Sequence, residues 1–174
     1  MHAMAIEAGE LAPLQVPMPQ PAGGELLIRV AYVGVNRADI MQLEGHYAPP
    51  QGASPLLGLE VSGWVAAMGV DATGFAVGDE VCALLSGGGY AEYVAVPASH
   101  VLALPKSVSL KTAASLPEAA ATSMMALIHA GSLKAGERVL IHGGTSGVGI
   151  LMTQIAKSLG AEVFATVGGT QKAS

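Results

Sequence analysis

Residues 140–149 read "LIHGGTSGVG", a short apolar run that leads into a cluster of glycines. The stretch that follows, "ILMTQIAKSLGAEVFATVGG" (150–169), contains a helical pattern and then a second short apolar run. From Val148 the apolar residues fall at 148, 151, 152, 155 and 159, which is one face of a helix, and Gly160 is a natural stop. The order strand, glycine turn, helix, strand predicts a βαβ unit.

The turn itself is Gly144-Thr145-Ser146-Gly147-Val148-Gly149, which is close to the dinucleotide-binding pattern G-x-G-x-x-G. Ser146 replaces the middle glycine of that pattern. Glycines permit a tight turn, let a phosphate approach the backbone and leave N–H groups of the helix N-terminus directed at the anion. We therefore predict that this turn binds the diphosphate of a dinucleotide. A purely structural strand-to-helix turn is the alternative.

The end of the second strand indicates which dinucleotide to expect. NAD enzymes usually carry an acidic residue there, about 20 residues beyond the turn, which accepts a hydrogen bond from the ribose 2′-hydroxyl. Here the end reads "ATVGGTQK" (165–172), and no Asp or Glu follows Glu162. Lys172 supplies a cation just beyond the strand. The pattern favours NADP, with a solvated surface lysine as the alternative interpretation of Lys172.

The first part of the chain has a different character. A helix is expected at 36–45, with Asn36 as its cap and Gly45 as its stop, and a loop at 46–55. Strand patterns occupy 25–35, 60–69, 78–84, 87–97 after a glycine hinge, and 100–105. Many short strands separated by turns indicate a compact barrel or sandwich. We expect a β domain over 1–110 and the start of an α/β domain over 111–174, where the alanine-rich segment 107–133 favours helix.

Composition excludes several classes of protein. Of the 174 residues 51% are hydrophobic and 12% are charged, so a hydrophobic core is expected. A net charge of −5 argues against a nucleic-acid surface. No apolar run approaches the roughly 20 residues of a membrane span, and the N-terminus lacks a secretory pattern. Cys82 is the only cysteine, so an intrachain disulfide is impossible and a cytoplasmic location is expected.

Four stretches resemble one enzyme family in order along nearly the whole chain. They are "VGVNRADIMQLEGHYAPPQGASPLLGLEVSGWV" (33–65), "VGDEVCALLSGGGYAEYVAVP" (77–97), "LPEAAATSMMAL" (116–127) and "VLIHGGTSGVGILMTQIAKSLGAEVFATVGGTQK" (139–172). They are similar to the quinone oxidoreductase branch of the medium-chain dehydrogenase/reductase superfamily, and within it to the p53-inducible quinone oxidoreductase type. The resemblance implies a β-rich GroES-like catalytic domain followed by the start of a Rossmann domain, α/β overall. Family members continue for about as long again, so a truncated chain is expected.

Zinc alcohol dehydrogenases of the same superfamily provide a contrast. They place a cysteine where this chain has Asn36 in "GVNRAD", and a histidine where it has Leu59 in Gly58-Leu59-Glu60. Leucine cannot bind a metal, and asparagine is a poor zinc ligand. We therefore expect no metal site, and we expect Glu60 to take part in a hydrogen-bond network of its strand.

The resemblance also implies roles for single residues. Asn36 and Tyr47 would line the substrate pocket, with Tyr47 also facing the nicotinamide. The alternative for Asn36 is that it only caps a helix, and the alternative for Tyr47 is that it only packs in its loop. Thr122 would touch the cofactor near the nicotinamide. The residues expected at the pyrophosphate are Ser146, Gly147 and Val148, between Gly144 and Gly149, and those expected at the adenosine 2′-phosphate are Gly168, Thr170 and Lys172.

These observations lead to one main functional hypothesis and two alternatives. Without a metal ion to act as a Lewis acid, the site should favour substrates that accept hydride readily. For such a substrate, close and oriented placement beside C4 of NADPH is enough for hydride transfer. We expect a zinc-independent, NADPH-dependent oxidoreductase that transfers hydride to a quinone or an α,β-unsaturated carbonyl. The alternatives are an enoyl-thioester reductase and a non-catalytic nucleotide-binding or interaction fragment. For the whole protein the resemblance implies a homodimer.

Overall fold

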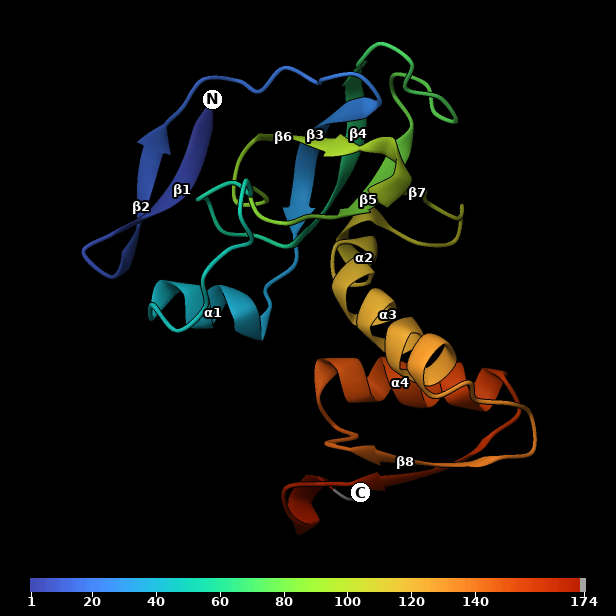
Figure 1. Cartoon of the computed structure of the whole chain (residues 1–174). Coiled ribbons are helices and arrows are strands. Elements are labelled where there is room, and N and C mark those ends of the chain that lie inside the picture. Colours follow the sequence, from blue (N-terminus) through green and yellow to red (C-terminus); the bar gives the residue numbers. More distant parts are fainter. Residues whose placement is uncertain (173–174) are drawn as a thin grey trace. The chain divides into compact units, whose positions relative to one another are not determined.

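The computed structural model describes residues 1–172, and the chain divides into two compact units, Met1–Pro117 and Glu118–Ser174 (Figure 1). The first unit is built around β-strands, and the second has helices and a small parallel sheet. This order of a β unit followed by an α/β region is the one predicted. Among the described residues, no helix has the length and apolar character needed to cross a lipid bilayer.

A five-stranded antiparallel sheet forms the centre of the first unit, with the strand order β6-β3-β4-β5-β7. Its strands are β3 (Glu25–Val33), β4 (Glu60–Met68), β5 (Glu80–Leu84), β6 (Tyr93–Pro97) and β7 (Val101–Ala103). The inward side chains form one hydrophobic core, in which Leu26, Ile28 and Val61 are fully buried. The strand patterns at 25–35, 60–69, 78–84 and 100–105 are therefore confirmed, with ends shifted by one to two residues.

The helices of this unit are short. They are α1 (Arg37–Leu43), the 3₁₀ turn η1 (Ala98–His100) and α2 (Leu110–Ala113). The helix predicted at 36–45 is confirmed, and Gly45 follows it in the left-handed conformation with φ 76°. Ser62 on β4 donates a hydrogen bond of 2.6 Å from its hydroxyl to the carbonyl oxygen of Leu110, which fixes the start of α2 on the sheet.

A hairpin at the N-terminus was not predicted. Strands β1 (His2–Glu7) and β2 (Glu10–Gln15) pair antiparallel around Ala8 and Gly9, whose φ angles are 49° and 83°. Two consecutive positive φ angles are typical of a tight hairpin turn. Most residues of β2 are exposed, so this strand has no buried face that would give its sequence an alternating pattern.

The strand pattern over 87–97 begins later than predicted, and this expectation is corrected. Tyr90 and Glu92 precede β6, which starts at Tyr93. The backbone N–H of Gly88 donates to the carbonyl oxygen of Leu56, and that of Tyr90 donates to Leu57. The hinge residues are therefore held by the 56–58 segment rather than by a neighbouring strand of the sheet.

The second unit contains the predicted βαβ arrangement. Its elements are α3 (Pro117–Met124), the π-helix η2 (Met125–Ala130), β8 (Arg138–His142), α4 (Gly147–Ser158), β9 (Glu162–Thr166) and the 3₁₀ turn η3 (Thr170–Lys172). Strands β8 and β9 are parallel, in a register that runs from Arg138 opposite Glu162 to His142 opposite Thr166. Gly160 follows α4 with φ 82°, as its assignment as a helix stop predicts.

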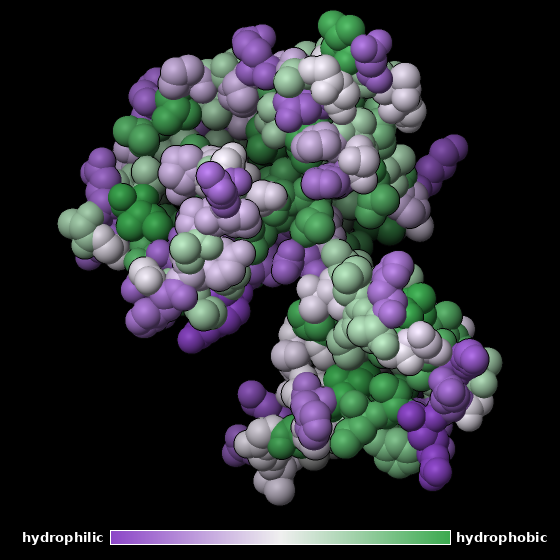
Figure 2. Space-filling view, in the orientation of Figure 1, coloured by the Kyte–Doolittle hydropathy of each residue, from purple (hydrophilic) through white to green (hydrophobic). Residues whose placement is uncertain are grey.

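Burial in the second unit is uneven. Ile141 on β8 and Ala156 on α4 are buried, with 4% and 0% of their surface exposed. Leu140 and Phe164, which lie opposite each other in the strand register, are 57% and 49% exposed. Figure 2 shows hydrophobic residues on the visible surface of this unit. Because successive side chains of a strand point to opposite faces, one face of the two-stranded sheet is packed while the other remains exposed.

Candidate functional site

Hydrogen bonds fix the turn between β8 and α4 at both of its ends. At its start, the N–H of Gly144 donates to the carbonyl oxygen of Thr166 on β9 over 3.0 Å. At its end, Ser146 is the N-cap of α4, and its hydroxyl oxygen accepts a hydrogen bond of 3.1 Å from the N–H of Gly149. The serine therefore caps the helix, which a glycine at this position could not do through a side chain.

The three glycines between residues 144 and 149 have different roles. A Cβ on Gly149 would meet the carbonyl oxygen of Gly143, and a Cβ on Gly144 would meet the side chain of Ala165. A Cβ on Gly147 would have no atom within 4 Å. Gly144 and Gly149 are thus required by packing inside the unit, whereas Gly147 faces open space.

Two backbone N–H groups remain at the start of α4. Gly147 and Val148 are the first two residues of the helix, and such positions have no acceptor within their own helix. The third N–H, that of Gly149, is taken by Ser146. Since a helix N-terminus carries a partial positive charge, these two groups form a site that suits a phosphate oxygen.

The residues predicted around the 2′-phosphate lie beyond the end of β9. Gly168, Thr170 and Lys172 are all exposed, and Lys172 is the last residue of η3. A Cβ on Gly168 would have no neighbour within 4 Å, so the chain leaves space on this segment as well. Thr122 is also exposed, on α3. All predicted cofactor residues therefore belong to the second unit, and Asn36 and Tyr47 belong to the first.

In the first unit, Asn36 stands at the N-cap position of α1. Its backbone N–H donates to Oδ2 of Asp39 over 2.8 Å, and its side-chain Nδ2 donates to Oε1 of Glu60 over 2.9 Å. Glu60 is the first residue of β4 and is only 2% exposed. Asn36 is thus at the cap, as one interpretation predicts, while its side chain is held by a buried carboxylate.

Asp39 is a buried polar residue that the sequence analysis missed. It is 3% exposed, and its carboxylate also accepts from the N–H of Gly58 at 3.2 Å and from the hydroxyl of Tyr90 at 3.4 Å. Burial, followed by the charge of Asp39, raises the pKa of Tyr90 from 10.0 to about 12. Tyr90 therefore stays protonated near neutral pH and can keep donating this bond. An Asp three residues after a capping Asn is the signal that could have identified it.

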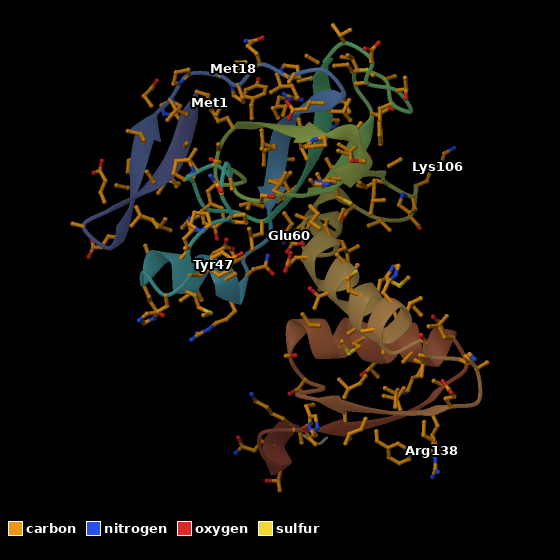
Figure 3. The ribbon with its side chains drawn as sticks, in the orientation of Figure 1. Met1, Met18, Tyr47, Glu60, Lys106 and Arg138 are labelled. Atoms are coloured by element: carbon orange, nitrogen blue, oxygen red, sulfur yellow. The ribbon has the colours of Figure 1, made fainter. Side chains whose placement is uncertain are left out.

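The remaining candidate of the first unit is Tyr47, and the cysteine Cys82 is buried in the same unit. Tyr47 is half-buried in the loop after α1, and Figure 3 labels it together with Glu60. Burial, and then the charge of Glu60, raises the pKa of the Cys82 thiol, so the thiol stays protonated and is a weak nucleophile.

Among residues 1–172 no group of three or more His, Cys, Asp or Glu side chains is arranged to hold a metal ion.

Comparison with known proteins defines the class of the first unit. Residues 22–106 match the family model of the alcohol dehydrogenase GroES-like domain. The chain therefore contains a GroES-like domain of the medium-chain dehydrogenase/reductase superfamily, followed by the start of an α/β region.

Relatives of this superfamily cover nearly the whole chain. The chain is 38% identical over 158 residues to the quinone oxidoreductase of Sus scrofa. It is similar to the CurK enoyl reductase (32% identity, TM-score 0.88) and to a mycobacterial protein solved in complex with NADPH (37% identity, TM-score 0.85). These matches cover 88%, 98% and 99% of this chain, but the chain spans only 47%, 55% and 55% of the respective relatives.

The packing of the turn predicts opposite effects on stability for substitutions at two of its glycines. Gly149→Ala forces a methyl group against the Gly143 carbonyl and should lower the free energy of unfolding by about 2 kcal/mol. Gly147→Ala places its methyl group in open space at a helical position and should leave stability unchanged or raise it by up to about 1 kcal/mol. Urea unfolding of the two variants and the wild type measures both effects. A Gly149→Ala variant as stable as wild type would contradict the close packing described above.

Proposed function

We propose that this protein is a zinc-independent, NADPH-dependent oxidoreductase that transfers hydride to a quinone or an α,β-unsaturated carbonyl, as the p53-inducible quinone oxidoreductase type does. The observation that carries the proposal is that Gly147 and Val148 are the first two residues of α4, where backbone N–H groups have no acceptor within the helix, and that Gly147 has open space beside it. A relative of similar fold was solved with NADPH, and another is a quinone oxidoreductase, which supports the same assignment.

The residues present suit an NADP molecule. The N–H groups of Gly147 and Val148 would bind the diphosphate, with Gly144 and Gly149 keeping the turn tight around it. No Asp or Glu occurs between residues 163 and 172, so no carboxylate there would repel a 2′-phosphate. Lys172, with Gly168 and Thr170, would supply the cation and the space for that phosphate. Thr122 would contact the cofactor near its nicotinamide.

The chemical part of the proposal assigns roles to the first unit. The bound cofactor would supply a hydride from C4 of its nicotinamide ring. Asn36 carries two hydrogens on Nδ2, and one of them is directed to Glu60. The other could donate to the acceptor oxygen of a substrate and stabilise the negative charge that develops on it. Tyr47 would line the same pocket and face the nicotinamide.

A second candidate function is the reduction of an enoyl thioester. The observation that favours it is the likeness to the CurK enoyl reductase, whose TM-score of 0.88 is higher than the 0.85 of the protein solved with NADPH, although its sequence identity is lower. Both reactions deliver hydride to an electron-poor acceptor, so the same turn and the same asparagine would serve either. Homodimerisation of the whole protein and its reducing, cytoplasmic location stay predictions.

The purified protein should oxidise NADPH in the presence of a simple quinone such as 1,4-benzoquinone, and NADH should be a much poorer donor. Loss of absorbance at the wavelength of reduced nicotinamide measures the rate. A crotonyl thioester in place of the quinone is the matched comparison, and faster turnover of the thioester would select the enoyl reductase. NADPH binding without turnover of any quinone, enone or enoyl thioester would instead support a non-catalytic nucleotide-binding module.

Lys172→Gln should weaken NADPH binding by about fivefold and leave NADH binding unchanged. The reason is that one exposed ion pair with the 2′-phosphate contributes about 1 kcal/mol. Isothermal titration of both nucleotides measures the two effects. Lys157→Gln, which removes an exposed lysine from the last turn of α4, is the control and should bind both nucleotides like wild type. Equal losses for NADPH and NADH in the Lys172 variant would show that this lysine does not recognise the 2′-phosphate.

A further inference from the structure

We infer that Thr166 is a positioning residue that holds the glycine turn in the shape in which its N–H groups face the phosphates. The inference rests on the NADPH binding proposed above and assigns a role to a residue outside the motif. Thr166 is the last residue of β9 and lies opposite His142, the last residue of β8. It therefore stands at the point where both strands end and the turn begins.

Thr166 binds two consecutive backbone groups of the turn. Its carbonyl oxygen accepts from the N–H of Gly144 at 3.0 Å, and its hydroxyl oxygen Oγ1 accepts from the N–H of Gly143 at 3.2 Å. Any residue at this position could provide the first bond through its backbone. Only a side chain with a short acceptor can provide the second, so the hydroxyl of Thr166 matters here.

The hydroxyl has a further neighbour that accounts for its orientation. Nδ1 of His142 lies 3.3 Å from Oγ1 of Thr166. A hydroxyl has one donor hydrogen and two acceptor lone pairs, so Oγ1 can accept from Gly143 while its hydrogen is directed to the imidazole. With both contacts made, the side chain is fixed on the turn.

The position of Gly143 is transmitted to the phosphate-binding N–H groups by a short series of contacts. The carbonyl oxygen of Gly143 accepts from the N–H of Ser146 at 2.9 Å, and the hydroxyl of Ser146 accepts from Gly149 at 3.1 Å. Gly149 in turn packs so closely on Gly143 that it has no room for a Cβ. Release of Gly143 from Thr166 would therefore loosen Ser146 and the two helical residues after it.

The role predicts a selective defect. The hydroxyl of Thr166 is already engaged by Gly143 and His142, and Thr166 precedes the segment 168–172 proposed to surround the 2′-phosphate. Its loss should weaken the binding of ligands that carry the diphosphate and spare a ligand that carries only adenosine and its 2′-phosphate. A residue that merely stabilises the unit would not distinguish these two ligands.

The experiment compares wild type, Thr166→Val and Thr166→Ser by isothermal titration with NADPH and with adenosine 2′-monophosphate. Thr166→Val, which keeps the shape and removes the hydroxyl, should bind NADPH about fivefold more weakly. Its affinity for adenosine 2′-monophosphate should stay within about twofold of wild type, which also shows that the variant is folded. Thr166→Ser restores the hydroxyl and should recover NADPH binding.

Ser158→Ala is the control, because it removes a hydroxyl that bonds to the carbonyl oxygen of Ile155 at the far end of α4 and has no contact with the turn. It should bind both ligands like wild type. If Thr166→Val binds NADPH as well as wild type, or loses both ligands equally, the positioning role is wrong while the proposed cofactor stands. If wild type itself does not bind NADPH, the proposed function fails and the inference fails with it.

Discussion

The close approach between the start of α4 and the turn that precedes it is the constraint on which the rest of the site depends. Gly149 lies against the carbonyl of Gly143, and Gly144 lies against Ala165 of β9, so neither position has room for a side chain. Because the helix begins this close to the sheet, its first N–H groups lie at the carboxyl end of β8. That edge of a parallel sheet is where open α/β folds bind nucleotides.

The serine in the turn is consistent with this geometry. Ser146 stands where the pattern usually has a more flexible glycine, and its hydroxyl caps α4. The N–H groups of Gly147 and Val148 are then the ones available to an anion.

In the first unit an equally fixed side chain is found. Asn36 is held at its backbone by Asp39 and at its amide by Glu60, so both parts of the proposed site are prearranged within their own units.

Local features of the fold could be predicted from the sequence, and contacts distant along the chain could not. The βαβ unit was predictable because its strand, turn and helix patterns are contiguous between 139 and 166. The cap of α1 was equally local. The partners of Asp39 are 19 and 51 residues away at Gly58 and Tyr90, and no periodic pattern indicates which residues will meet there. The hydroxyl of Thr166 reaches Gly143 across 23 residues for the same reason.

The central claim is that the N–H groups of Gly147 and Val148 bind a diphosphate. The most direct measurement is a nuclear magnetic resonance titration of the ¹⁵N-labelled chain with NADPH, followed through its amide signals. The account predicts that the signals of Gly147 and Val148 move most within the turn, while those of the buried strands β3 and β4 stay in place. Saturable NADPH binding with unchanged signals at both residues would contradict it.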